Sequence, residues 1–262
     1  MYANKRLGQH FLHDPAVIAR ILAAIDAQPG EHIVEIGPGR GALTAGLAAS
    51  GVRLTVIERD RTLATELAAR PDLAAAEVLQ ANALKVDYAA LAADGPIRIV
   101  GNLPYNISTP LLFRFLEAAP RIRDMTFMLQ REVVERMAAQ PDTRAYGRLT
   151  VMLAARCRVE KLFTVGAGAF NPPPKVESAV VRLVPHAEPP FDPGDWNLFE
   201  QLVRAGFTAR RKTLRNALRA LTGATTIEAA GLDPCARPDT LAPADYARLA
   251  KTLDITPPPS KP

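Results

Sequence analysis

The chain of 262 residues contains only two cysteines, Cys157 and Cys235, and only four histidines. Two cysteines cannot build a disulfide framework, and their flanks lack the spacing of metal ligands. The sequence has no uninterrupted apolar run of about 18 residues, which a membrane-spanning helix would need. The first ten residues include Lys5 and Arg6 but no apolar stretch typical of a secretory signal. These absences predict a cytoplasmic protein that binds no metal and does not enter a membrane.

Positive charge is concentrated in one part of the chain. The net charge is +5, and residues 200–222 alone contain six basic residues and one acidic residue. Such a concentration is typical of a surface that binds a polyanion, most simply nucleic acid. A solvated helix face without any partner would have the same composition, so composition alone leaves both interpretations open.

The first two thirds of the chain alternate between short apolar runs and helical patterns. Asp14 and Pro15 mark a helix start, because Asp caps helices and proline is favoured in the first turn. Strand-like runs then recur about every 20–25 residues, which leaves room for one helix between them and predicts a mostly parallel sheet. The expected strands lie at 33–36, 54–57, 77–79, 97–100 and 125–129, with an antiparallel finish near 156–159 and 179–184.

A change of composition divides the chain. Residues 185–193 contain four prolines, too many for a helix or a central strand. The sequence therefore predicts an α/β domain over residues 1–190 and a small helical domain over 191–262. The segment Pro257–Pro259 predicts a disordered tail.

A glycine-rich segment follows the first expected strand. Residues 35–42 read EIGPGRGA, and glycines at such a position let the backbone approach a ligand. Glu58 ends the next strand, at the place from which a carboxylate can accept hydrogen bonds from ribose hydroxyls. The pattern also satisfies the dinucleotide fingerprint, so these residues by themselves leave a nicotinamide-dependent oxidoreductase open.

The segment Asn102-Leu103-Pro104-Tyr105 follows the fourth strand, where ligands bind in this class of fold. Proline restricts the turn and holds the Leu103 carbonyl in place. The Asn102 side chain and the Leu103 carbonyl could accept the hydrogens of an amino group, and Tyr105 could stack on the base that bears it. The alternative is an ordinary Asx-Pro turn with a packed tyrosine.

Phe170 precedes the stiff run Pro172–Pro174. A polyproline segment can hold an aromatic ring at a fixed place, so Phe170 could form a second stacking wall. Taken alone, the run favours a rigid connector with Phe170 in the core.

Six motifs, in this order, resemble those of the ribosomal RNA adenine N6-dimethyltransferases. They are most similar to the bacterial small-subunit (16S) group of that family, which is linked to kasugamycin sensitivity. The motifs are GQHFL at 8–12, EIGPGRG at 35–41, NLPYNIST at 102–109, YGRL at 146–149, FNPPPKV at 170–176 and FTARRKTLRN at 207–216.

The resemblance implies a Rossmann-like Class I methyltransferase domain, a helical C-terminal domain and S-adenosylmethionine as the methyl donor. The substrate would be two adjacent adenines in the 3′-end hairpin of small-subunit rRNA, dimethylated at N6 by a monomer acting on the immature 30S particle. The implied donor contacts are His10, Leu12, Gly37, Glu58, Asn82 and Asn102. The base-handling residues would be Asn102, Leu103, Tyr105 and Phe170, and the RNA-binding residues Arg210, Arg211, Lys212 and Arg215.

Two positions depart from the family pattern. Many members have asparagine in place of His10, and most have aspartate in place of Asn82, which puts one contact to the donor adenine in doubt. Two functions remain open beside this one. They are an assembly factor that mainly binds the subunit, and a resistance enzyme that acts on large-subunit RNA.

Overall fold

The computed structural model describes residues 10–105 and 107–255. The expected tail at Pro257–Pro259, and Gly8 and Gln9 of the first motif, lie outside the described residues. Contacts divide the described chain into two compact units. The first contains the residues up to Val134 together with Val159–Pro185, and the second contains Glu135–Arg158 together with the residues from His186 onward.

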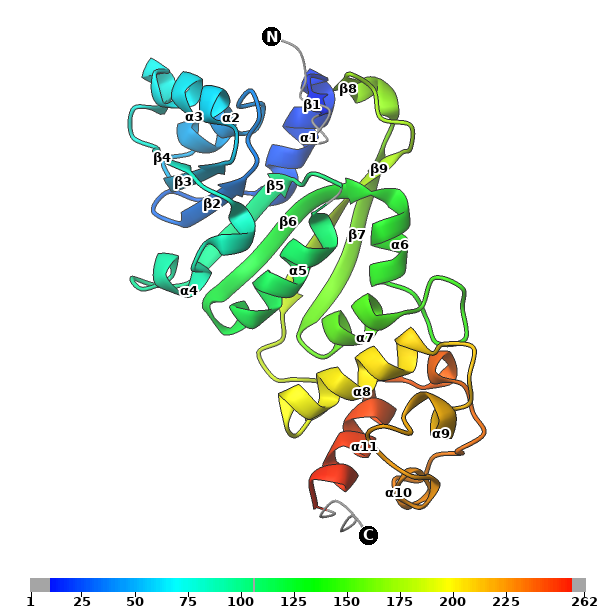
Figure 1. Ribbon diagram of the computed structural model, residues 1–262. Helices are drawn as coiled ribbons and strands as arrows, with labels where there is room; N and C mark the ends of the chain where they lie inside the picture. Colours follow the sequence, from blue (N-terminus) through cyan, green and yellow to red (C-terminus); the bar gives the residue numbers. More distant parts are fainter. Residues whose placement is uncertain (1–9, 106, 256–262) are drawn as a thin grey trace. The chain divides into compact units, whose positions relative to one another are not determined.

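The first unit is built on a sheet that has seven strands among the described residues, in the order β4-β3-β2-β5-β6-β9-β7. Strands β2 to β6 pair in parallel, and β9 pairs antiparallel with β6. The predicted mostly parallel sheet with an antiparallel finish is confirmed (Figure 1). The strands are β2 (His32–Ile36), β3 (Arg53–Glu58), β4 (Glu77–Gln80), β5 (Ile97–Asn102), β6 (Ile122–Gln130), β7 (Cys157–Val165) and β9 (Ser178–Pro185).

Helices connect the parallel strands. Helix α1 begins at Pro15 as predicted, because the Asp14 carboxylate accepts hydrogen bonds from the N–H groups of Ala16 and Val17. It ends at Ile25, and the next residue, Asp26, adopts a left-handed conformation with φ of 50°. The α-helices of this part of the chain are α1 (Pro15–Ile25), α2 (Thr44–Ala49), α3 (Arg61–Ala68), α4 (Tyr88–Leu91), α5 (Ser108–Glu117) and α6 (Arg131–Met137). Short 3-10 turns lie at Pro71–Leu73, Ala83–Lys85, Ala119–Arg121 and Ala167–Ala169.

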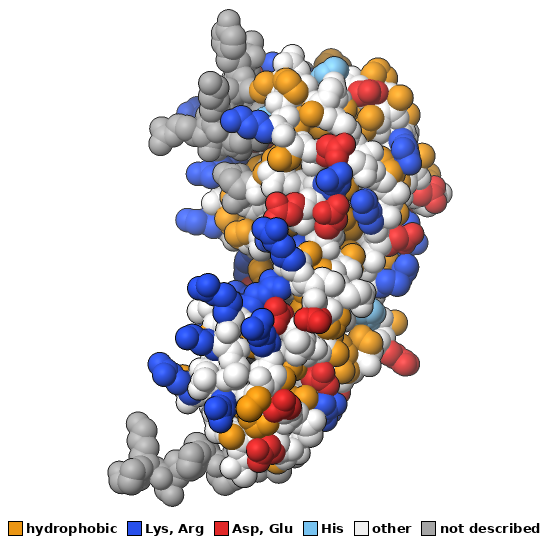
Figure 2. Space-filling view, turned by 90° about the vertical axis from the view of Figure 1, so that its right-hand side faces the viewer, with side chains coloured by type: hydrophobic (Ala, Val, Ile, Leu, Met, Phe, Trp, Pro, Cys, Tyr) orange, Lys and Arg blue, Asp and Glu red, His pale blue; other side chains and the backbone are white. Residues whose placement is uncertain are grey.

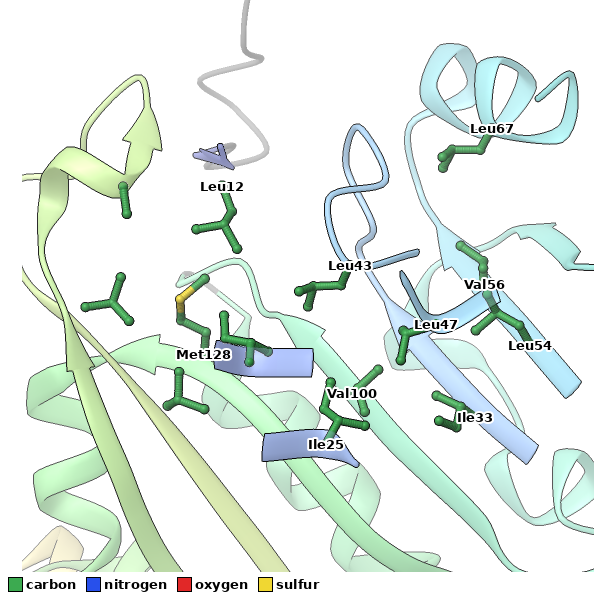
Figure 3. Close-up of a cluster of buried hydrophobic side chains, with 14 of the residues drawn as sticks. Leu12, Ile25, Ile33, Leu43, Leu47, Leu54, Val56, Leu67, Val100 and Met128 are labelled. Atoms are coloured by element: carbon green, nitrogen blue, oxygen red, sulfur yellow. The ribbon is translucent and has the colours of Figure 1, made fainter. Parts of the chain in front are cut away.

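Both faces of the sheet are covered by apolar side chains from these helices. On one face, Ile25 of α1 and Leu47 of α2 join Val100 of β5 in a single buried cluster (Figure 3). On the other face, Phe115 of α5 stacks on Phe127 of β6 at 5.3 Å between ring centroids. Because β5 and β6 are buried on both sides, their residues read as nearly continuous apolar runs, as parallel strands do.

A second, two-stranded sheet was not anticipated from the sequence. Strand β1 (Phe11–Leu12) pairs antiparallel with β8 (Phe170–Asn171), and Leu12 lies opposite Phe170. Leu12 points toward Met128 in the same apolar cluster (Figure 3). This pairing joins the first motif of the chain to the proline-rich motif.

The second unit is helical, which agrees with the helical region predicted near the C-terminus. Helix α8 packs on α7 and on α11. The helices of the second unit are α7 (Arg148–Ala154), α8 (Trp196–Thr208), α9 (Leu214–Ala217), α10 (Ala224–Ala229) and α11 (Pro243–Ile255), and a 3-10 turn lies at Pro238–Thr240. Residues 135–158 group with this unit, although the sequence suggested a single division near residue 190. In the described part of the chain, no helix is long and apolar enough to span a membrane.

A buried arginine ties the end of α1 to the sheet. The Arg98 guanidinium is bound in bidentate fashion by Asp124, at 2.9 and 3.0 Å, and also by Glu31 at 2.6 Å. It donates further hydrogen bonds to the Ile25 and Asp26 carbonyls, which have no partner within the helix because α1 ends there. The arginine is 4% exposed, so its charge is balanced by these protein groups and not by water.

We therefore expect Arg98→Ala to lower the free energy of unfolding by up to about 3–5 kcal/mol, since Glu31 and Asp124 lose their shared buried counter-ion and keep Arg123 and Arg182 as ion-pair partners. Urea unfolding measures this change. The matched control is Arg53→Ala, which breaks the exposed Arg53–Asp94 pair and should cost under about 1 kcal/mol. Equal losses in the two variants would contradict a special role for the buried network.

Candidate active site

A pocket opens in the first unit where the parallel strands β2, β3, β4 and β5 reach their carboxyl ends. This is the edge of an open α/β sheet at which ligands bind. The structure brings all six of the predicted donor-contact residues to its lining: His10, Leu12, Gly37, Glu58, Asn82 and Asn102. Leu103 and Tyr105 line it as well.

The glycine-rich segment forms one wall because its backbone is left-handed at two points. Gly37 has φ of 64° and Gly39 has φ of 59°, a conformation that side-chain-bearing residues rarely adopt. A Cβ atom on Gly39 would also lie 3.0 Å from the Phe11 ring. The chain can therefore run close to a ligand here without a side chain in the way.

Glu58 lies at the end of β3 and is held by backbone groups of the same wall. Its two carboxylate oxygens accept hydrogen bonds from the N–H groups of Gly39, at 3.3 Å, and Asp60, at 2.8 Å. Burial raises the pKa of Glu58 above its usual value, although these hydrogen bonds oppose the shift. The carboxylate is thus fixed in position with lone pairs directed to the pocket that it lines.

Glu35 is a second pocket carboxyl group, which the sequence analysis did not single out. It is 1% exposed, and its Oε2 atom has no hydrogen-bond partner in the structure. Burial, together with the nearby Glu58 charge, raises the pKa of Glu35 to about 7. One signal was available in the sequence, because Glu35 is a charged residue inside the apolar run Ile33–Ile36.

The Asn102–Tyr105 segment forms a second wall, which adjoins the first at Gly37. The Asn102 Nδ2 atom donates to the His10 carbonyl at 3.2 Å, and the Leu103 N–H donates to the Met128 carbonyl at 3.2 Å. The Tyr105 hydroxyl is hydrogen-bonded to Ser178 at 2.6 Å. The Tyr105 ring stacks on His10 with 5.8 Å between ring centroids. The amide, the peptide and the ring are therefore each restrained by a separate contact.

Phe170 differs from the prediction. Its side chain is 2% exposed, belongs to the apolar cluster that contains Leu12, and does not line the pocket. The physical reason is the β1–β8 pairing, which sets Phe170 opposite Leu12 and behind the pocket wall. In this structure the expected two-sided stacking site has only the Tyr105 side.

Asn82 already makes a local hydrogen bond. Its Oδ1 atom accepts the Leu84 N–H at 3.1 Å and caps the 3-10 turn Ala83–Lys85. The residue lines the pocket, but the amide oxygen that could accept a hydrogen bond from a ligand is partly committed to this cap.

In the second unit, the four predicted RNA-binding residues do not share one helix face. Residues 209–213 lie between α8 and α9, so the helical pattern is interrupted. Arg210 is half-buried. Its guanidinium forms an ion pair with Asp239 at 2.9 Å and donates hydrogen bonds to the carbonyls of Thr143 and Arg144. Arg211, Lys212 and Arg215 are exposed. The structure thus sets Arg210 apart from the other three as an internal tie.

Comparison with known proteins identifies the family. A family model described as "Ribosomal RNA adenine dimethylase" matches residues 1–254, nearly the whole chain. The chain belongs to this family. Within the family, it is 56% identical over 253 residues to "Ribosomal RNA small subunit methyltransferase A" of Pseudomonas aeruginosa, which covers 96% of this chain and 94% of that protein. The protein of the same name from Acinetobacter baylyi is 51% identical over 253 residues, covering 96% of this chain and 92% of its own length.

Two solved structures resemble the fold over more than nine tenths of this chain. A dimethyladenosine transferase from Plasmodium falciparum superimposes with a TM-score of 0.78 at 26% identity, covering 92% of this chain and 96% of that one. The 23S rRNA methyltransferase ErmE gives a TM-score of 0.69 at 31% identity, covering 93% of this chain and 99% of that one. The predicted methyltransferase fold of this dimethylase family member is thereby confirmed.

The buried Glu35 carboxyl group predicts a pH-dependent stability for the ligand-free protein. Because its pKa is raised to about 7, the folded state retains a proton that the unfolded state loses above about pH 4.5. The free energy of unfolding should therefore fall by about 3 kcal/mol as the pH rises from 4.5 past 7.

Glu35→Gln should remove this decline, which urea unfolding at pH 5 and pH 8 measures. Glu66→Gln, at an exposed position of α3, serves as the control and should leave the wild-type profile unchanged. A wild-type decline that persists in full in Glu35→Gln would rule out Glu35 as its source.

Proposed function

We propose that this protein transfers methyl groups from S-adenosylmethionine to N6 of two adjacent adenines in the 3′-end hairpin of small-subunit rRNA. The product would be two N6,N6-dimethyladenosines, made during subunit biogenesis in the cytoplasm by a monomer bound to the immature 30S particle. The observation that carries this proposal is that the Asn102–Tyr105 wall lines the same pocket as the glycine loop and Glu58, in a member of the adenine dimethylase family.

Sequence identity favours small-subunit over large-subunit RNA as the substrate. The chain is 56% identical to a protein named for the small subunit and 31% identical to one named for 23S rRNA. A nicotinamide-dependent oxidoreductase, which the glycine motif alone left open, finds no support in the family.

The charges of the pocket fit a cationic methyl donor. Glu35 has a buried carboxylate oxygen without a partner, and Glu58 is a second carboxylate of the same lining. A donor with a sulfonium and an ammonium group would offset the electrostatic cost of bringing these acidic side chains together. S-adenosylmethionine supplies an activated methyl group on a positively charged sulfur. Glu58 would accept hydrogen bonds from its ribose hydroxyls, and Gly37 and Gly39 leave room for it.

The orientation of the Asn102 amide supports its role toward the target adenine. Its Nδ2 group donates to the His10 carbonyl, so its Oδ1 atom is left to accept a hydrogen from the adenine amino group. A second acceptor at the Leu103 carbonyl would hold the other hydrogen. Held in this way, the nitrogen becomes pyramidal, and its lone pair is directed at the methyl group. No general base is required of the chain.

Tyr105 would supply the stacking surface for an adenine flipped out of the RNA. Its ring lines the pocket beside Asn102 and Leu103, and its hydroxyl is anchored to Ser178. Phe170 is buried, so we assign this task to Tyr105, the pocket aromatic next to Asn102 and Leu103, whose ring also stacks on His10.

The decisive experiment is the transfer of labelled methyl groups to unmethylated small subunits, followed by mass mapping of the rRNA. We expect two dimethylated adenines next to each other in the 3′-end hairpin, and no product with Asn102→Ala. Product at other adenines, or in large-subunit RNA only, would refute the substrate.

Asn82 provides a prediction specific to this chain. In Asn82→Asp one carboxylate oxygen can keep the Leu84 cap while the other accepts a hydrogen bond from the donor's adenine amino group. A charged acceptor contributes about 1.5–3 kcal/mol against about 0.5–1.5 for a neutral one. We therefore expect donor binding to tighten by about fivefold, which calorimetric titration with S-adenosylmethionine measures.

The saturated rate of methyl transfer should be nearly unchanged by this substitution, because Asn82 follows β4 whereas the base-handling residues follow β5. Equal donor affinities in the two proteins would mean that residue 82 does not contact the donor.

We propose that Arg211, Lys212 and Arg215 bind RNA phosphates. Their side chains are exposed and form no ion pair or hydrogen bond with the residues that the structure describes. In the lower part of Figure 2, which shows the second unit, Lys and Arg side chains gather at the left edge, where few acidic side chains lie. Arg210, tied to Asp239, is assigned the structural task of holding the Thr143–Arg144 backbone.

Neutralising Arg211, Lys212 and Arg215 together should weaken subunit binding and flatten its dependence on salt. The slope of log affinity against log salt should fall by about 0.7–0.9 for each phosphate that the variant no longer binds. Binding titrations between low and high salt measure the slope. The matched control is Arg210→Gln, which should leave the slope unchanged and lower the free energy of unfolding. A slope that changes only in the control would reverse the assignment.

A further inference from the structure

The hydroxyl of Tyr105 forms a hydrogen bond with a side chain far away in the sequence. Its oxygen lies 2.6 Å from the Oγ atom of Ser178, 73 positions later in the chain. Ser178 is the first residue of β9 and pairs with Gln130 at the end of β6. It is fully buried, with 0% of its surface exposed, and it does not line the pocket.

The two ends of this hydrogen bond differ in rigidity. Ser178 is held in the sheet, where it pairs with Gln130 of β6 and where β9 lies between β6 and β7. Tyr105 lies in the connection between β5 and α5, outside regular secondary structure. A tyrosine ring held only at its Cβ atom can swing between rotamers of its first side-chain torsion, whereas a hydrogen bond at the hydroxyl end fixes the direction in which the ring extends. The hydroxyl oxygen lies on the axis of the second torsion, so rotation of the ring about that axis is limited by the stacked His10 ring instead.

The anchored ring is the one that the proposed chemistry needs. Tyr105 lines the pocket beside Asn102 and Leu103, so the place of its ring decides whether an adenine stacked on it presents its amino group to them. A ring swung to another rotamer would still be apolar and aromatic, but it would no longer lie where it orients the base.

We propose that Ser178 is a positioning residue, which acts through the Tyr105 hydroxyl to hold the Tyr105 ring at the place where it receives the target adenine. This role rests on the proposed function. Burial raises the pKa of Tyr105, so its hydroxyl keeps its proton, and the hydrogen bond persists, over the pH range of an enzyme assay.

A double-mutant cycle tests the proposal. Tyr105→Phe keeps the ring and removes the hydroxyl, while Ser178→Ala keeps the strand and removes the partner. Each should lower kcat/KM for unmethylated small subunits by roughly 2- to 12-fold, the value of one hydrogen bond. The double variant should be no worse than the poorer single variant, since both remove the same interaction.

Two measurements separate positioning from damage to the fold. The affinity for S-adenosylmethionine should be unchanged in all three variants, because Ser178 does not line the pocket. The matched control is Thr126→Val, which removes another buried hydroxyl, on strand β6 beside β9, that has no hydrogen-bond partner and does not line the pocket. This control should keep wild-type kinetics.

The proposal is overturned if Ser178→Ala lowers turnover as much in the Tyr105→Phe background as in the wild type, since Ser178 would then act by another route. It is also overturned if Ser178→Ala has no effect while Tyr105→Ala abolishes base capture. Failure of the proposed function looks different. In that case Tyr105→Ala itself leaves methyl transfer to the subunit unchanged, or the wild type transfers none, and the positioning role falls with it.

Discussion

The parallel pairing of β2 with β5 is the constraint on which the site depends. The two strands lie so close at their carboxyl ends that a Cβ atom on Gly101 would stand 2.4 Å from the Ile36 carbonyl oxygen. Glycine at this position allows the segment after β2 and the segment after β5 to lie side by side and to line one pocket. The glycine loop and the Asn102–Tyr105 wall would otherwise belong to separate surfaces.

The acidic side chains of the pocket illustrate how a binding site can oppose stability. Glu35 and Glu58 are both buried, and burial raises the pKa of each. A fold selected for stability alone would place apolar residues at these positions, as it does at Ile33 and Ile57 on the same strands. Two buried acids at the edge of a pocket are most easily explained by a cationic ligand, which restores their charge balance when it binds.

The basic residues of the second unit show why charge must be read together with contacts. Arg210 and Arg211 are adjacent and chemically identical, and composition assigns them the same role. In the structure Arg210 gives three hydrogen bonds to Asp239 and to the loop at residues 143–144, whereas Arg211 is exposed. An arginine whose donors are already satisfied gains little from a phosphate, so only an exposed one contributes counterion release.

Local pattern by itself determined much of this protein. The start of α1 at Pro15, the five parallel strands, the antiparallel β9 and the helical C-terminal region all follow from spacing and capping, which act over a few residues. The sequence also predicts that the residues after each strand lie close together, because parallel strands bring their carboxyl ends to one edge of the sheet. What only the tertiary structure decided are contacts between distant segments. The β1–β8 pairing buries Phe170, Asp239 engages Arg210, and Ser178 anchors Tyr105. Each depends on two segments that meet only after the whole chain has folded, so no local pattern could specify it.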